Sequence, residues 1–89
     1  MQRKRSRIDI IDDMLNAIQN KGGQIKPTHL MYKSNLSHQQ MKSYLEELVD
    51  KNFVERKKEK YEYIILTEKG NEFLQKIGEM KSFQEAFGL

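Results

Sequence analysis

Residues 34–48, with the sequence SNLSHQQMKSYLEEL, join a short polar turn to a helix that is apolar on one side only. Ser37 predicts the N-cap of this helix, and Gln40 stands at the capping-box position three residues later. The apolar residues recur at helical spacing and predict a buried stripe formed by Met41, Leu45 and Leu48. Such a helix must pack against other elements through this stripe while its polar side stays in solvent.

A longer helix is predicted near the N-terminus. Ser6 is suited to its N-cap, with Asp9 completing a second capping box. The apolar stripe that follows at helical spacing consists of Ile8, Ile10, Ile11, Met14, Leu15 and Ile18. Gly22 and Gly23 end this helix, because glycine adopts the left-handed conformation at low cost.

Between these two helices the sequence predicts a short helix over residues 27–33. Pro27 suits its first turn, and we expect Leu30, Met31 and Tyr32 to point inward. Residues 24–25, just before it, are long enough for a single rung of a sheet.

A hairpin is predicted after the third helix. One strand begins at residues 53–54, and YEYIIL, residues 61–66, is a second strand rich in β-branched and aromatic side chains. RKKEK, residues 56–60, is expected to be a charged connection between them. Tyr61 and Tyr63 share one face of their strand, and we expect that face to lie against the core.

Composition limits the possible classes of protein. A chain of 89 residues with 37% hydrophobic and 33% charged residues fits one small helix-rich domain. The absence of cysteine excludes disulfides and thiolate chemistry. No apolar run approaches the roughly 20 residues of a membrane helix, and the basic N-terminus lacks the apolar segment of a signal peptide. We therefore expect a cytoplasmic protein.

Basic residues gather at two places in the sequence. The formal net charge is only +3, yet Arg3, Lys4, Arg5 and Arg7 all lie within the first seven positions. A second cluster consists of Arg56, Lys57, Lys58 and Lys60. Two local clusters on a near-neutral body favour contact with a polyanion at defined places. Short basic tails and solvated turns are the plainer interpretation of charge alone.

The predicted order is helix, short strand, helix, helix, strand, strand, helix. A helix, a tight turn, a second amphipathic helix and then a hairpin is the layout of a winged helix-turn-helix, an α+β fold that is mainly α. In this layout the outer face of the third helix fits a major groove. The hairpin, called the wing, reaches the neighbouring phosphate backbone or minor groove.

This layout predicts a set of contacts with double-stranded DNA. The third helix supplies Ser37, His38, Gln39, Lys42 and Ser43. The turn before it supplies Lys33, Ser34 and Asn35. The wing supplies Arg56, Lys57, Lys58 and Lys60, and a basic arm over residues 1–5 supplies Arg3, Lys4 and Arg5. The helix would read bases, because glutamine pairs with adenine and lysine with guanine, while the wing and arm would give sequence-independent affinity.

Three segments carry a resemblance to a known family: THLMYKSNLS at 28–37, YLEELVDKNFVE at 44–55 and LTEKGNEFL at 66–74. In this order and spacing they resemble the archaeal winged-helix DNA-binding proteins, whose best-known members are the ten-kilodalton chromatin-associated proteins of Sulfolobus. The resemblance covers roughly residues 6–80. It implies a winged-helix domain over 6–66 and a C-terminal helix over 67–89 that pairs with its twin. It also implies a homodimeric transcription regulator or chromatin component, associated with the nucleoid.

The last helix has material for such pairing. An apolar stripe near heptad spacing is formed by Phe73, Ile77, Met80, Phe83 and Phe87. Phe73 and Ile77 are also placed to pack on the domain's own core. The other three lie further out and would form an apolar patch on a monomer. Gly78 and Ser82 weaken the helix, so folding back of the tail is the alternative to dimerisation.

Catalysis, metal binding and small-molecule binding have no support in the sequence. His29 and His38 lack the spacing and partners of a metal site, and no glycine-rich phosphate loop or nucleophile–base arrangement is present. We therefore expect no enzyme activity and no cofactor. The competing hypothesis is a winged-helix module that docks on another protein without touching DNA.

Overall fold

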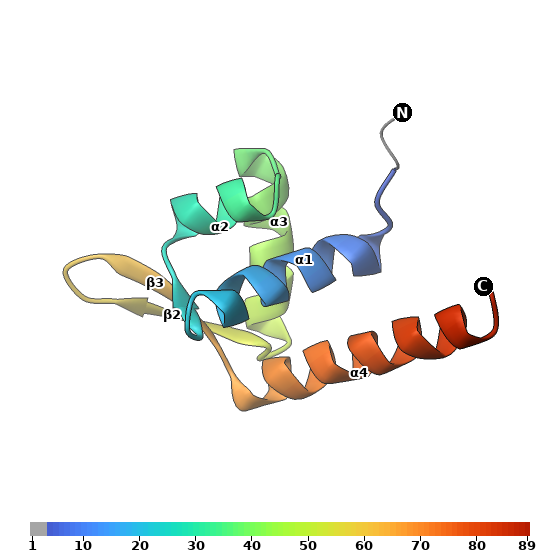
Figure 1. The fold of residues 1–89 in the computed structure, drawn as a ribbon. Coiled ribbons are helices and arrows are strands. Elements are labelled where there is room, and N and C mark those ends of the chain that lie inside the picture. Colours follow the sequence, from blue (N-terminus) through green and yellow to red (C-terminus); the bar gives the residue numbers. More distant parts are fainter. Residues whose placement is uncertain (1–3) are drawn as a thin grey trace.

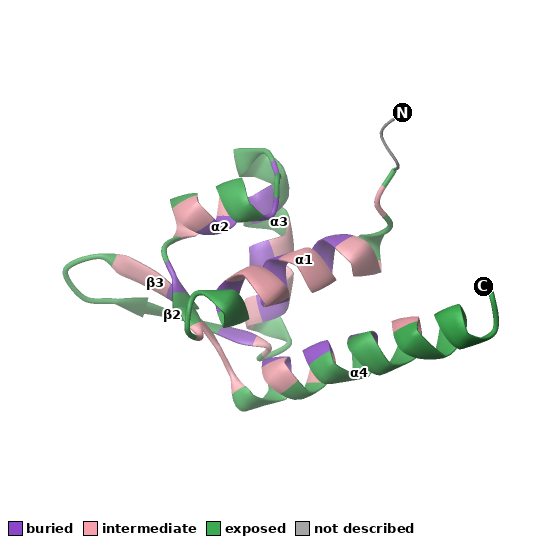
Figure 2. Cartoon of the chain, viewed as in Figure 1, coloured by how far each residue is buried: buried purple, intermediate pink, exposed green. Residues whose placement is uncertain are grey.

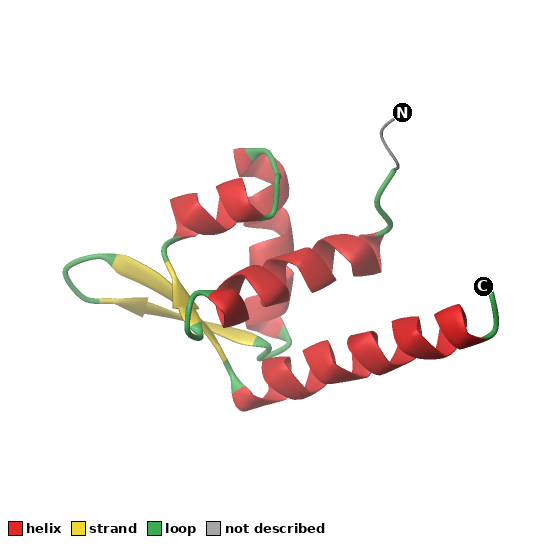
Figure 3. Cartoon of the chain, viewed as in Figure 1, coloured by secondary structure: helices red, strands yellow, loops and turns green. Residues whose placement is uncertain are grey.

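The fold combines helices with one small antiparallel sheet, as a computed structural model that describes residues 4–89 shows (Figures 1 and 3). In chain order the elements are α1 (Arg7–Asn20), β1 (Gln24–Ile25), α2 (Pro27–Lys33), α3 (His38–Asp50), β2 (Val54–Lys58), β3 (Glu62–Leu66) and α4 (Glu68–Ala86). The predicted order of elements and the predicted α+β, mainly helical class are both confirmed.

The core is built around α1. Met14, Leu15 and Ile18 are fully excluded from solvent, and α2, α4, β1 and β3 all pack on this helix. The predicted stripe of α3 is buried as well, through Met41, Leu45 and Leu48. Burial of one such side chain contributes about 1.5–3 kcal/mol, so this shared core supplies most of the stability of so short a chain.

Capping boxes begin both long helices of the domain core, as predicted. The Ser6 hydroxyl accepts a hydrogen bond from the Asp9 backbone N–H, and the Ser37 hydroxyl accepts one from that of Gln40. Each reciprocal bond runs from the backbone N–H of the serine to the side chain three residues later. These bonds fix the first residues of α1 and α3.

Tyr32 was expected to point inward, and this prediction was wrong. Its side chain is 74% exposed, whereas Leu30 is completely buried. Side chains two positions apart on a helix point in directions that differ by about 200° around its axis. Because α2 packs on the core only through the side that carries Leu30, Tyr32 must face solvent.

The sheet has the order β1-β3-β2, with both pairs antiparallel. The predicted rung at residues 24–25 pairs with Ile64 and Ile65 of β3. β2 and β3 form a hairpin that projects away from the helices, on the side opposite to the chain termini (Figure 1).

Two details of this hairpin differ from the prediction. β2 continues to Lys58, so only residues 59–61 form the loop; charged side chains are tolerated there because β2 is an edge strand. Ile64 is the fully buried residue of β3. Tyr61 and Tyr63 therefore lie on the face away from the core, because side chains alternate along a strand. YEYIIL has apolar residues on both faces, so its alternation did not decide which one is buried.

A tight joint fixes the start of α4. The Thr67 hydroxyl accepts from the Gly70 N–H at 2.9 Å and donates to the Asn52 carbonyl oxygen at 2.7 Å. A Cβ atom on Gly70 would lie 2.0 Å from the carbonyl oxygen of Phe53. Only glycine therefore allows the first turn of α4 to approach the start of β2 this closely.

Further along, an ionic contact holds α4 beside α1. Lys81 Nζ lies 2.8 Å from Asp12 Oδ2 and 3.3 Å from Asp9 Oδ1. The hydrogen bond to Asp12 is the main cause of a raised pKa for Lys81. The backbone N–H of Ser6, its hydroxyl and then Lys81 lower the pKa of Asp9 to about 2.

The Gly70 joint gives a matched pair of stability predictions. Gly70→Ala should lower the free energy of unfolding by about 2 kcal/mol or more, because the backbone carbonyl of Phe53 cannot yield without moving β2. Gly78→Ala, at a position on the same helix with open space around it, should instead raise it by up to about 1 kcal/mol. Urea denaturation followed by circular dichroism measures both, and equal effects at the two sites would contradict the joint's role.

Candidate nucleic-acid interface

The N-terminal half of α3 presents a polar face to solvent. The predicted base-reading residues are all exposed there, namely His38, Gln39, Lys42 and Ser43. On the opposite side Met41 and Leu45 are buried. Packing and the capping box therefore hold this backbone, and the polar side chains project from a fixed frame.

A shallow hollow lies between this face and the hairpin. It is lined by Pro27, His38, Met41, Lys42, Leu45, Arg56 and Glu62. Arg56 pairs across the strands with Ile64, so it projects from the same face of the sheet as that buried residue. Lys58 shares this face by alternation, and Lys57 projects from the other one.

The hairpin is less basic than its lysine run indicates. Arg56 Nη1 lies 3.5 Å from Glu62 Oε1, and Lys57 Nζ lies 3.2 Å from Glu59 Oε1. Among the described residues, no carboxylate lies within ion-pair distance of Lys58 or Lys60. The predicted four-residue cluster therefore separates into two compensated cations and two uncompensated ones.

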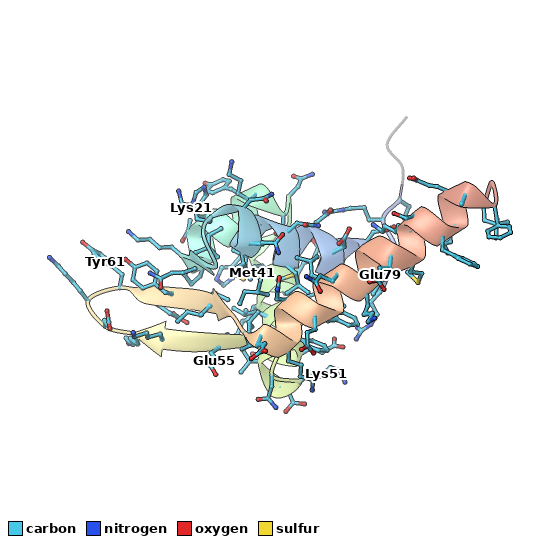
Figure 4. The ribbon with its side chains drawn as sticks, turned by 60° about the horizontal axis from the view of Figure 1, so that its bottom comes forward. Lys21, Met41, Lys51, Glu55, Tyr61 and Glu79 are labelled. Atoms are coloured by element: carbon cyan, nitrogen blue, oxygen red, sulfur yellow. The ribbon has the colours of Figure 1, made fainter. Side chains whose placement is uncertain are left out.

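Lys26 joins this region from another element, and the sequence did not indicate it. Its Nζ lies 4.2 Å from the ring centroid of Tyr61, and Lys60 Nζ lies 5.8 Å from the same centroid. Tyr61 is half exposed at the end of the hairpin (Figure 4). Lys26 follows β1, which pairs with β3, and only that pairing brings the lysine here.

The turn before α3 contains one predicted contact that the structure does not support. Lys33 and Asn35 are exposed, but Ser34 is 1% exposed, and its hydroxyl has no hydrogen-bond partner among the described residues. Its side chain cannot reach a ligand at the surface. Ser34 fills the space beneath the turn instead of contributing to the interface.

The predicted basic arm is only partly described. Arg3 lies outside the described residues, and Lys4 is exposed. Arg5 is not free, because its guanidinium bonds to the Asp13 carboxylate and to two carbonyl oxygens of the turn before α3. The last residue of the predicted arm is thus attached to the folded domain.

The apolar stripe of α4 divides into two parts. Phe73 stacks on Phe53, with ring centroids 4.5 Å apart, and Ile77 is buried. Burial in its own domain removes Ile77 from the predicted dimer interface, and Phe73, which is partly buried, packs on the same core. Phe83 and Phe87 are 63% and 68% exposed, and Met80 is exposed too. Figure 2 shows this distal part of α4 as almost entirely exposed.

Two other kinds of feature are absent from residues 4–89. No group of three or more histidine or acidic side chains is placed to hold a metal ion. No helix among these residues combines the length and apolar character needed to cross a membrane.

The arrangement of a helix-turn-helix followed by a hairpin matches a known family. The sequence model of the winged helix-turn-helix family fits residues 4–85. The chain belongs to this family. α2, the turn and α3 form its helix-turn-helix, and β2 and β3 form its wing.

Two relatives in sequence come from an archaeon. The uncharacterized protein MJ0287 of Methanocaldococcus jannaschii is 35% identical over 77 residues, which cover 86% of this chain and 74% of that protein. MJ0290 of the same organism is 36% identical over 77 residues, and the match spans only 34% of its length.

Solved structures show the same fold. Sso10a-2, a DNA-binding protein from Sulfolobus solfataricus, superposes with a TM-score of 0.82 at 23% identity, covering 93% of this chain and 85% of that one. F93 from STIV, a winged-helix DNA-binding protein, superposes with a TM-score of 0.76 at 18% identity, covering 91% and 92%. At these identities the likeness establishes the architecture.

Two serines on either side of the turn should respond oppositely to truncation. Ser34→Ala removes a buried hydroxyl without a protein partner and should leave stability unchanged or raise it by about 1 kcal/mol. Ser37→Ala removes the N-cap of α3 and should lower stability by about 1 kcal/mol. Thermal melting of the two variants beside the parent measures this, and a marked loss in Ser34→Ala would show that its hydroxyl is satisfied.

Proposed function

We propose that the chain binds double-stranded DNA as a homodimer and acts as a transcription regulator or a chromatin-associated protein of the nucleoid. In this proposal the N-terminal half of α3 enters the major groove and the wing lies along the phosphate backbone. The proposal includes no cofactor and no catalytic step.

The main support is a set of cations without carboxylate partners on α3 and on the wing, of which Lys42 lines the hollow between the two elements. Among the described residues no carboxylate lies within ion-pair distance of Lys42 on α3, and the same holds for Lys58 and Lys60 on the wing. Lys26 adds a further cation to the wing, because its Nζ lies 4.2 Å from the ring centroid of Tyr61. Cations placed next to an exposed helix face bind phosphates with release of counterions, which is the main source of affinity for DNA.

The proposed contacts have different roles. Gln39 and Lys42 are suited to base edges, because glutamine can pair with adenine and lysine with guanine. His38 and Ser43 flank them on the same exposed face. Phosphate contacts are assigned to Lys33 and Asn35 in the turn, to Lys58 and Lys60 on the wing and to Arg3 and Lys4 in the arm.

The similar structures support DNA binding in general. Sso10a-2 and F93 are both named as DNA-binding proteins. Each of these structures covers more than nine tenths of this chain.

A homodimer is proposed because the distal part of α4 carries apolar side chains that its own domain does not cover. Phe83 and Phe87 contact each other, with centroids 4.9 Å apart, and Met80 lies one turn earlier. Two Phe and a Met on a projecting helix are unfavourable in water. Pairing with the same segment of a second copy would cover both patches through one self-complementary contact.

The alternative is a module that docks on a protein partner. The ion pairs Arg56–Glu62 and Lys57–Glu59 favour it to some extent, because they reduce the net positive charge of the wing. Binding to DNA at moderate salt distinguishes the two hypotheses.

The uncompensated lysines should dominate the salt dependence of DNA binding. Fluorescence anisotropy with a mixed-sequence duplex across a salt titration should give a clear slope for the parent. The double variant Lys58→Ala, Lys60→Ala should bind more weakly, with a slope reduced by roughly 0.9 for each lost phosphate contact. Lys42→Glu should reduce binding further, because it places a carboxylate in the groove.

The matched control is Lys51→Ala with Lys76→Ala, which removes the same charge from exposed positions outside the proposed interface. Its slope should equal that of the parent. If the salt slope falls by the same amount in both double variants, DNA binding depends on net charge alone and the proposed interface is wrong. Absence of binding by the parent at low salt would favour the protein-docking alternative.

The tail should control the oligomeric state. Phe83→Glu should convert the dimer into a monomer, as measured by light scattering coupled to size-exclusion chromatography, because two carboxylates would meet in an apolar contact. Ser82→Glu adds the same charge one residue away and to one side of the stripe, and it should leave the dimer intact. A parent that is monomeric at high concentration would refute the dimer while leaving DNA binding to be tested separately.

A further inference from the structure

One member of the N-terminal basic cluster is committed to the folded domain. Arg5 Nη1 donates to Asp13 Oδ2 at 2.9 Å and to the Ser34 carbonyl oxygen at 2.7 Å, and Nη2 donates to the Asn35 carbonyl oxygen at 2.8 Å. Three of the five N–H donors of the guanidinium are thus in use. Its positive charge is already paired with a carboxylate, so little charge remains to attract a phosphate.

The two carbonyl groups that Arg5 binds lie at the end of α2. The last carbonyls of a helix lack partners within the helix and carry the negative end of its dipole. Asn35 has a φ of 53°, the left-handed conformation in which asparagine often follows the last residue of a helix. The hydrogen bonds from Arg5 to the carbonyl oxygens of Ser34 and Asn35 add external support to this turn.

The conformation of this turn determines the position of α3. The Leu36 N–H donates to the Met31 carbonyl oxygen at 3.1 Å, and the Leu36 side chain is buried. Ser37 caps α3 immediately afterwards. A displacement of the Asn35 carbonyl would therefore move the N-terminal half of α3, where the proposed base contacts lie.

We infer that Arg5 is a positioning residue, which holds the turn between α2 and α3 in the conformation that presents α3 to DNA and does not itself bind phosphate. The inference rests on the proposed function. It leaves the proposed phosphate contacts of this segment to Arg3 and to Lys4, which is exposed and has no carboxylate within ion-pair distance among the described residues.

Substitution by lysine separates the two roles of an arginine. The planar guanidinium reaches a carboxylate and two carbonyls at once, whereas the ammonium of lysine is a single point charge. Arg5→Lys would retain a phosphate contact if there were one. It cannot reproduce the three hydrogen bonds to Asp13, Ser34 and Asn35.

The experiment compares Arg5→Lys with Lys4→Ala in the full chain. The readouts are DNA anisotropy across a salt titration and, without DNA, hydrogen exchange of the Leu36 amide by NMR. Arg5→Lys should bind about tenfold more weakly with the salt slope of the parent, and its Leu36 amide should exchange faster. Lys4→Ala should bind with a slope lower by roughly 0.9 and leave Leu36 exchange unchanged.

The inference is overturned if Arg5→Lys binds DNA like the parent, or if its Leu36 amide keeps the protection of the parent. If Arg5→Lys does not fold, Asp13→Asn takes its place: it weakens one of the three hydrogen bonds, so the Leu36 amide should exchange faster by a smaller factor, and unchanged exchange overturns the inference. If the parent binds no DNA, the proposed function fails. Leu36 exchange in the free protein then decides alone: faster exchange in the variant supports the positioning of the turn, and unchanged exchange overturns it.

Discussion

The burial of one side of α1 is the constraint on which the fold depends. Met14, Leu15 and Ile18 are completely buried, and α2, α4, β1 and β3 reach their positions by covering this helix. A chain of 89 residues has material for one core only. The surfaces proposed to bind DNA and a second copy are therefore the outer sides of elements whose inner sides build that core.

Because each element has one buried and one exposed side, the candidate interface consists of polar and charged side chains. α3 buries Met41 and Leu45 and exposes Lys42 between them, so stability and binding use different residues of the same turn of helix. The wing contributes little to the core beyond Val54 and Ile64. Its charges are arranged by strand pairing, which leaves Lys58 and Lys60 without carboxylate partners among the described residues. A small domain thereby gains a cationic surface at almost no cost to its packing.

Much of this architecture was predictable from local signals. The serines at positions 6 and 37 and the apolar stripes fixed the limits of the long helices, because capping and periodicity act over a few residues. Contacts between distant segments were not predictable. Nothing near Lys26 indicates that it meets Tyr61, and nothing near Arg5 indicates that it bonds to the turn at Asn35. Ser34 likewise lies in a polar segment that is typical of an exposed turn, and its burial follows only from the packing of α2 and α3.

The contact of Lys81 with Asp9 and Asp12 has a consequence for the proposed dimer. It lies beyond the last buried residue of α4, Ile77, and adds a contact with α1 at the point where the apolar tail begins, so it contributes to the angle at which that tail leaves the domain. In a pair of chains joined through their tails, this angle would set the separation of the two α3 helices along the duplex. An ion pair far from DNA would then contribute to the spacing of half-sites that the dimer accepts.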